Sequence, residues 1–251
     1  MSQTRPSPIQ LNQRGFSLVE IAIVLAVVSL LIGGVLRGQE LIAAARVRNV
    51  IDQVRAVQVA YYGFQDRYNA LPGDLTTAQA LTVSANASAA VVSPGDGWVP
   101  LDDSQQFFNN IALAGFITCT PCQTKQSTAS NPTANFSPTN LYGQPIGFAY
   151  PLTVPTTNAL GAYYWSTVAN EGTKAMVTTG GSIDSKSLAE MDRKIDDGSP
   201  ATGQFRFSDV VPSINGTLQN LPLANCLATN AAGADIWKVT PAGQCQGILL
   251  M

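Results

Sequence analysis

An apolar run near the N-terminus, with a single carboxylate near its start, constrains this chain more than any other feature. The 21 residues from Phe16 to Leu36 contain one charged side chain, Glu20, and no proline. A helix needs about 20 predominantly apolar residues to cross a bilayer, so this run is long enough to span a membrane. A charged group at membrane depth is costly and rare, which makes Glu20 a candidate functional residue.

Two simpler interpretations of the run compete with a functional role for Glu20. A cleaved signal peptide has a basic flank, an apolar stretch and a cleavage site of small residues. Arg5 and Arg14 supply the basic flank, but the run leads into a long helical pattern without such a site. A plain signal anchor fits the length and leaves Glu20 unexplained. The basic flank predicts that the N-terminal end stays in the cytoplasm and the C-terminal part is exported.

The segment around Glu20 resembles a known processing site. Residues 15–20, with the sequence GFSLVE, are similar to the cleavage site of type IV pilins and pseudopilins, the prepilin class. In that family a prepilin peptidase cuts after the glycine, and the new N-terminal residue is N-methylated. The resemblance therefore implies cleavage between Gly15 and Phe16, N-methylation of Phe16, and a role for Glu20 in filament assembly.

A physical reason for Glu20 follows from this resemblance. Subunits of such filaments pack their apolar helices side by side, which buries the positively charged N-terminus of each mature chain. A buried charge is expensive unless it is paired. We expect Glu20 of a neighbouring subunit to supply the opposite charge and to set the axial register between the two helices.

The same resemblance implies a function, partners and a location. The implied function is a structural subunit of a type IV pilus or of a type II secretion-like filament. A leader of 15 residues and a large head favour a minor subunit. The implied partners are other pilin or pseudopilin subunits, prepilin peptidase, an inner-membrane assembly platform and membrane lipid. The protein would reside in the bacterial inner membrane with a periplasmic head, and afterwards in the filament.

Two other function classes remain open from the sequence. One is a membrane-tethered adhesin or binding protein at a filament tip, which would use the large head for recognition. The other is an anchored thiol oxidoreductase at Cys119 and Cys122. The chain contains no histidine, which removes Ser-His-Asp and Cys-His nucleophile systems. We expect no enzymatic activity and no cofactor.

The composition of the C-terminal part indicates an exported, loop-rich domain. Charged residues make up 12% of the chain, which also contains 21 glycines and 15 prolines. From Leu71 onward there are 7 Lys and Arg against 12 Asp and Glu. Nonspecific nucleic-acid binding needs a basic footprint, so no nucleic-acid partner is expected.

The pattern along the chain predicts an α+β fold, in which one long N-terminal helix packs on an antiparallel β-sheet head. The predicted segments are a leader (1–15), a transmembrane or filament-core helix (16–36), the amphipathic second half of that helix (37–70) and an exported head (71–251). In the head we expect a loop over 76–94 and helices over 102–116 and 185–195, with Asp102 and Asp103 capping the first of these. Predicted strands cover 146–150, 162–168, 174–178 and 205–207.

The chain has four cysteines, and an even number in an exported domain favours two disulfides. Of the three possible connectivities we favour Cys119 with Cys122 and Cys226 with Cys245. The second pair would close a C-terminal loop that resembles the disulfide-bounded loop of many pilins. A zinc site is the rival interpretation, although the second pair lacks the close spacing typical of zinc ligands.

A cluster of acidic residues offers one weak candidate metal site. Asp192, Asp196 and Asp197 could present oxygen ligands to calcium. An Asp-Asp-Gly sequence after a helix is also a common turn, and this is the favoured interpretation. We therefore expect no metal.

Overall fold

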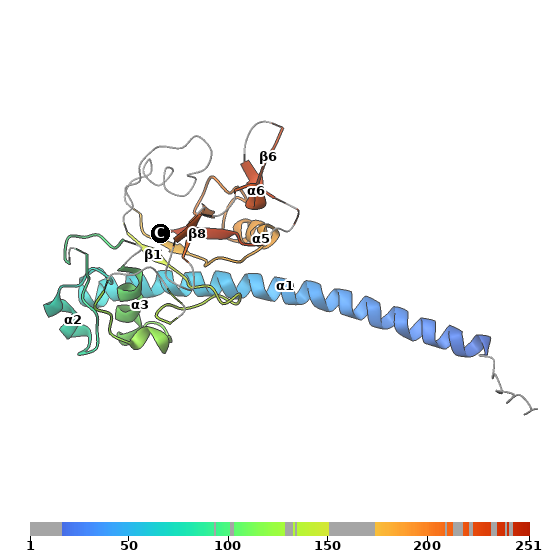
Figure 1. The fold of residues 1–251 in the computed structure, drawn as a ribbon, viewed down its shortest axis with the longest axis horizontal. Coiled ribbons are helices and arrows are strands. Elements are labelled where there is room, and N and C mark those ends of the chain that lie inside the picture. Colours follow the sequence, from blue (N-terminus) through green and yellow to red (C-terminus); the bar gives the residue numbers. More distant parts are fainter. Residues whose placement is uncertain are drawn as a thin grey trace, which may run out of the picture. The chain divides into compact units, whose positions relative to one another are not determined.

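The computed structural model describes residues 17–92, 94–100, 103–128, 133, 135–150, 174–208, 210–212, 218–220, 223–231, 235–238, 240 and 243–251. The chain divides into two compact units, one ending at Ala44 and the other beginning at Ala45. The division falls within helix α1 (Leu18–Tyr68), the blue-to-cyan helix of Figure 1.

Helix α1 is 51 residues long and has clear local signals at both ends. The hydroxyl oxygen of Ser17 accepts a hydrogen bond from the backbone N–H of Val19 at 3.3 Å. At the other end Asn69 has a φ of 48°, the left-handed conformation that commonly terminates a helix, and Pro72 follows. The long helix predicted over 16–36 and 37–70 is confirmed from Leu18 to Tyr68, and Phe16 lies outside the described residues.

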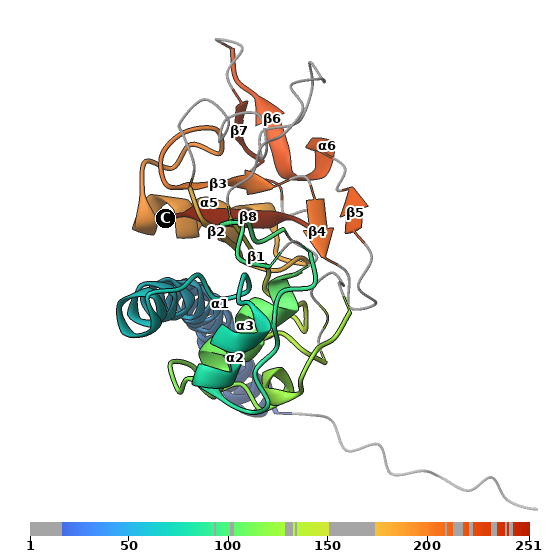
Figure 2. The ribbon, with the colours of Figure 1, turned by 90° about the vertical axis from the view of Figure 1, so that its left-hand side faces the viewer.

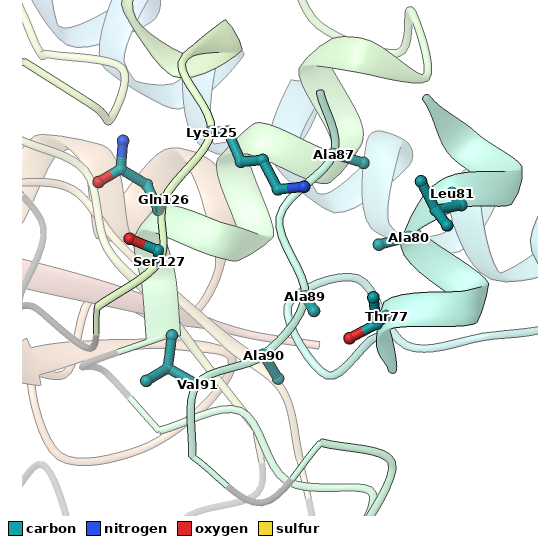
Figure 3. Close-up of a pocket in the computed structure, with 10 residues that line it drawn as sticks. All are labelled: Thr77, Ala80, Leu81, Ala87, Ala89, Ala90, Val91, Lys125, Gln126 and Ser127. Atoms are coloured by element: carbon teal, nitrogen blue, oxygen red, sulfur yellow. The ribbon is translucent and has the colours of Figure 1, made fainter. Parts of the chain in front are cut away.

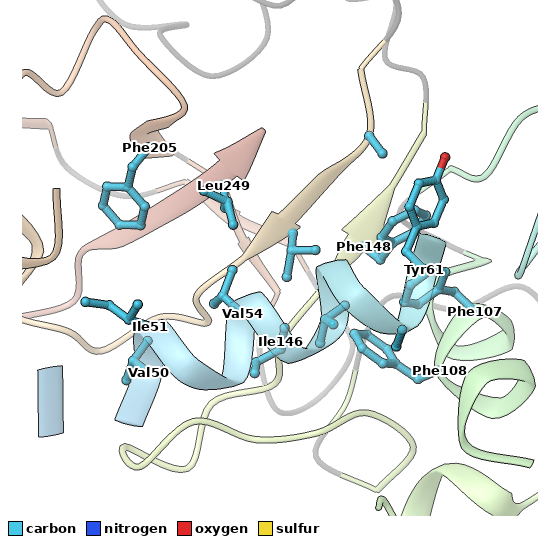
Figure 4. Close-up of a cluster of buried hydrophobic side chains, with 14 of the residues drawn as sticks. Val50, Ile51, Val54, Tyr61, Phe107, Phe108, Ile146, Phe148, Phe205 and Leu249 are labelled. Atoms are coloured by element: carbon cyan, nitrogen blue, oxygen red, sulfur yellow. The ribbon is translucent and has the colours of Figure 1, made fainter. Parts of the chain in front are cut away.

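Within the second unit, the C-terminal half of α1 buries one apolar stripe against the head (Figure 4). The stripe has the three- and four-residue spacing of an amphipathic helix, as the sequence predicts. Its buried members are Val47, Val50, Ile51, Val54, Val57, Ala60, Tyr61 and Phe64. This half of the helix is therefore part of the hydrophobic core of the head.

The head contains a four-stranded antiparallel sheet. Its strands are β1 (Phe148–Ala149), β2 (Met176–Thr178), β3 (Phe205–Ser208) and β8 (Gln246–Leu250), in the order β1-β2-β8-β3. Strand β8 pairs with both neighbours, with Leu249 opposite Val177 on one side and Phe205 on the other. Figure 2 looks along the C-terminal half of α1 and shows this sheet to one side of the helix.

Within the described part of the head, four further α-helices are present. They are α2 (Thr77–Val83), α3 (Ser104–Leu113), α5 (Ser185–Ile195) and α6 (Leu223–Cys226), and a short 3₁₀ turn, η2 (Pro121–Gln123), follows α3. Two small antiparallel pairs join β4 (Val210–Pro212) to β5 (Leu218–Asn220) and β6 (Leu227–Thr229) to β7 (Asp235–Trp237).

Aromatic side chains from three elements meet at the centre of the core. The ring of Phe107 on α3 stacks on that of Phe148 on β1, with the ring centroids 3.6 Å apart. Tyr61 of α1 lies 5.4 Å from Phe148 by the same measure. These contacts join α1, α3 and the sheet into one core (Figure 4).

The α+β fold, with a long N-terminal helix and an antiparallel sheet, is confirmed. The predicted helices over 102–116 and 185–195 correspond to α3 and α5, and three of the predicted strands contain β1, β2 and most of β3. The strand predicted over 162–168 lies outside the described residues.

Two local predictions are wrong. The stretch over 76–94 is not all loop, because Thr76 and Gln79 form a reciprocal capping box that begins α2.

The second wrong prediction concerns the start of α3. Asp103 stands at the N-cap position of α3, but its side chain does not cap the helix. Its carboxylate is buried and accepts a hydrogen bond from the backbone N–H of Val92 at 3.1 Å. Asp102 lies outside the described residues.

Candidate functional site

The structure places Glu20 in the first turn of α1, with its side chain exposed. The first N–H groups of a helix have no partner within it, and the helix dipole favours a negative charge at this end. The local position of Glu20 therefore suits a carboxylate. Gly15 and Phe16, the predicted cleavage and methylation residues, lie outside the described residues.

The N-terminal half of α1 is apolar on all sides. Its most hydrophobic stretch has a mean hydropathy of 2.7 and is long enough to cross a membrane, and none of it is buried by the residues that the structure describes. Large side chains such as Leu25 and Leu30 are 61% and 78% exposed. A helix with apolar residues all round belongs in lipid or among other helices.

Three glycines in this half of α1 have no packing contacts with the described residues. A Cβ atom added at Gly33, Gly34 or Gly38 would meet no other atom within 4 Å. Each glycine costs about 1 kcal/mol of helix stability relative to alanine. The contacts inside the described chain therefore do not explain why glycine stands at these positions.

Residues 10–36 match the family model described as the prokaryotic N-terminal methylation motif. This motif is the hallmark of prepilin-type proteins, the type IV pilins and pseudopilins. The resemblance of residues 15–20 to a prepilin processing site is thus confirmed at the level of the motif, which supports a type IV pilin-like subunit. The motif implies assembly with other pilin subunits and processing by prepilin peptidase, and it fits anchoring in the inner membrane.

The match is confined to the N-terminal segment and does not reach the head. No curated protein and no solved structure matches the chain. What the head does must therefore be argued from its own residues.

The four cysteines form the two pairs that the sequence analysis favours. The Cα atoms of Cys226 and Cys245 lie 5.7 Å apart, and those of Cys119 and Cys122 lie 5.3 Å apart. Both separations are typical of disulfides. Each sulfur-bearing side chain is at most 6% exposed, so the pairs are positioned as structural rather than catalytic groups.

We expect peptide mapping under non-reducing conditions to recover these two linkages. Replacing Cys226 and Cys245 together by serine should lower the free energy of unfolding by about 3 kcal/mol, because the bond closes a loop in the unfolded chain. The matched replacement of Cys119 and Cys122 should have a smaller effect, since that loop is only a few residues long. Recovery of a peptide that links Cys122 to Cys226 would contradict this pairing.

The structure brings Asp192, Asp196 and Asp197 together, with their candidate ligand oxygens within 4.8 Å of one another. All three carboxylates accept hydrogen bonds from the protein itself. Trp237 donates its indole N–H to Asp192 at 2.6 Å, and Thr202 donates its hydroxyl to Asp197 at 2.5 Å. Asp196 accepts hydrogen bonds from the backbone N–H groups that precede and begin β3. The cluster thus organises the turn between α5 and β3.

Because these carboxylates already accept hydrogen bonds from the protein, a calcium ion would compete with those donors for the same oxygens. We expect the melting temperature of the protein to be the same with and without EDTA. The measurement is differential scanning calorimetry at neutral pH, and protein first loaded with calcium is the control. A fall in the melting temperature that calcium reverses would establish a metal site at this turn.

Burial raises the pKa of Asp192 to about 6, although its hydrogen bonds from Trp237 and Gly198 act in the opposite direction. Between pH 4 and 6 the folded protein therefore holds a proton that the unfolded chain releases. This contribution to stability is complete below about pH 4 and is lost as the pH rises through 6. We expect the free energy of unfolding to fall over this range.

The matched variant Asp192→Asn tests this assignment. Asparagine cannot titrate, so the decline between pH 4 and 6 should become shallower in urea unfolding curves. Burial also raises the pKa of Asp74, so part of the decline should remain. A variant with the full slope of the wild type would show that Asp192 does not titrate in this range.

One feature of the head was not predicted from the sequence. A hollow of about 250 Å³ lies between α2 and the segments around Ala89 and Gln126 (Figure 3). The run of small residues at 87–90 is the one signal in the sequence that points to it, because alanines leave space where larger side chains would fill it.

Proposed function

We propose that this protein is a minor structural subunit of a type IV pilus or of a type II secretion-like filament. The observation that carries the proposal is the N-terminal methylation motif at residues 10–36, which includes the apolar beginning of α1. In this proposal the chain is cleaved between Gly15 and Phe16, and Phe16 is then N-methylated. The cleaved chain stays in the inner membrane with its head in the periplasm until it enters the filament.

The proposal gives each segment of the chain a role. Residues 1–15 form the leader that prepilin peptidase removes, and residues 16–36 form the part of the helix that lies first in lipid and then in the filament core. Residues 37–70 continue the helix towards the head, and residues 71–251 form the exported head. An inner-membrane assembly platform would extract the subunit from lipid.

Two features of α1 support the filament role. Its N-terminal half exposes apolar side chains on all faces, and such a surface needs partners once it leaves the bilayer. Gly33 and Gly34 have open space around them, so they would permit the close approach of a neighbouring helix. Glu20, near the start of the same helix, would pair with the methylated amino group of Phe16 of another subunit.

The mass of the intact protein extracted from membranes tests the processing steps. We expect a chain that begins at Phe16 and carries one additional methyl group. A strain without prepilin peptidase provides the control, in which the full-length chain should persist. A chain that keeps residues 1–15 in the presence of the peptidase would rule out the proposed cleavage.

The abundance of the protein in sheared filaments tests whether it is a minor subunit. We expect it at a small fraction of the amount of the principal subunit. Equal abundance would make it the principal subunit instead. Scarcity in filaments together with loss of adhesion on deletion would favour the alternative, a membrane-tethered adhesin or binding protein at the filament tip.

A further inference from the structure

The hollow beside α2 has a mainly apolar floor, with the polar residues Thr77, Gln126 and Ser127 and one charged residue, Lys125, around it. Small side chains from α2 and from the following segment line it, with Leu81 and Val91 at its edges (Figure 3). Ala80 and Ala87 are almost fully buried, so the floor is part of the packed head rather than a loose surface.

The walls of the hollow are held in place by buried amide side chains of α3. Asn109 accepts a hydrogen bond from the backbone N–H of Ser88 at 2.7 Å, and Asn110 donates to the carbonyl oxygen of Ser88 at 2.8 Å. Asn109 also donates to the carbonyl oxygen of Cys122 at 2.9 Å. The hydroxyl oxygen of Ser88 accepts from the backbone N–H of Gln126 at 2.6 Å, which ties the two walls together. The hollow is thus preformed, as small-molecule sites usually are.

Among the described residues that line the hollow, Lys125 is the only charged one. Figure 3 shows its side chain extending from its own segment towards the wall that contains Ala87. No residue in the described parts of the chain forms an ion pair with Lys125. An apolar floor with one unpaired ammonium group at its rim suits a ligand with an apolar body and a single negative charge.

We propose that this hollow binds a short aliphatic monocarboxylate. The hydrocarbon tail would lie on the alanine side chains, and the carboxylate would pair with the ammonium group of Lys125. A volume of about 250 Å³ is slightly below the roughly 300 Å³ at which sites for larger ligands begin. This size limits the tail to a few carbons and points to acids of about six carbons.

The probe for this site is n-hexanoate, added to the full chain in lipid nanodiscs with ¹³C-labelled alanine methyl groups. We expect saturable shifts of the methyl signals of residues around the hollow, namely Ala80, Ala87, Ala89 and Ala90. The dissociation constant should be on the order of 1 mM, because a ligand with so few heavy atoms has little free energy to gain. Shifts that rise linearly without saturation would show partition into lipid and would overturn the proposal.

Two variants separate the roles of the floor and the charge. Ala89→Leu, at a half-buried position, fills the hollow and should abolish the saturable shifts while the melting temperature stays the same. Lys125→Gln, at an exposed position, should weaken hexanoate binding by about two- to fivefold, the range of an exposed ion pair. Lys186→Gln replaces an exposed lysine of α5 that does not line the hollow, and it should bind as the wild type does.

The uncharged analogue n-hexanamide completes the test. The wild type should prefer hexanoate to hexanamide by about two- to fivefold, and Lys125→Gln should bind the two equally. Equal binding of both by the wild type would overturn the assignment of Lys125. Unchanged hexanoate binding by Ala89→Leu would overturn the site itself.

Discussion

Replacing Glu20 by alanine should leave cleavage and methylation intact and lower the yield of filaments roughly tenfold or more. In the filament core, the methylated amino group of a neighbouring subunit would lose its carboxylate partner. Leaving a buried charge unpaired costs about 3–5 kcal/mol, which is enough to stop subunit addition at ordinary concentrations. The measurements are the intact mass of the membrane-extracted protein and the amount of this protein in sheared filaments.

The matched control is Glu40→Ala, a change of the same side chain on the same helix. Glu40 pairs with Arg37 at 2.6 Å, and both side chains are more than two-thirds exposed. Such surface pairs contribute little, so this variant should assemble as the wild type does. Normal filaments from Glu20→Ala would remove the assembly role assigned to Glu20, whatever the control shows.

Phe107→Ala should be the most damaging of the changes considered within the head, and should lower its free energy of unfolding by about 4 kcal/mol. Phe107 is fully buried and stacks on Phe148, where the rings of α1, α3 and β1 meet. The large cavity left by alanine would lie at the centre of this cluster. Chemical denaturation of the full chain, followed by near-ultraviolet circular dichroism, measures the loss.

The comparison is the truncation of a large apolar side chain to alanine at an exposed position. Leu141 is 53% exposed, and Leu141→Ala should change stability by no more than about 0.5 kcal/mol. If Phe107→Ala cost less than about 1 kcal/mol, the core would have to repack around the missing ring. The three-element cluster would then not be the centre of head stability.

The helices of this fold were predictable because their signals are local. The apolar spacing of α1 and α5 repeats every three or four residues, and Pro72 marks the stop of the long helix. The capping box of α2 was also present in the sequence. The surrounding segment is rich in alanine, serine and threonine, however, and a loop was predicted there instead. Asn109 and Asn110 of α3 are buried because their side chains form hydrogen bonds with the backbone of Ser88. The spacing of apolar residues along a helix does not predict the burial of such polar side chains.

The sheet was harder to predict because its strands are short and each strand pairs with a segment that is distant in sequence. Strand β8 is buried along its whole length, so its residues show no alternation between apolar and polar. The two candidate sites also differed in how far the sequence could predict them. The motif around Glu20 is contiguous in sequence and was recognised, whereas the hollow at Lys125 joins two segments about forty residues apart.

The position of β8 in the sheet also determines when the head can finish folding. Among the described strands β8 comes after all the others in chain order, yet it lies between β2 and β3 and pairs with both. Strand β2 can pair with β1 before β8 is synthesised, but nothing joins β2 to β3 in the sheet until β8 is in place. The sheet therefore stays incomplete during that interval, and the facing edges of β2 and β3 remain unpaired and prone to wrong association until β8 inserts between them.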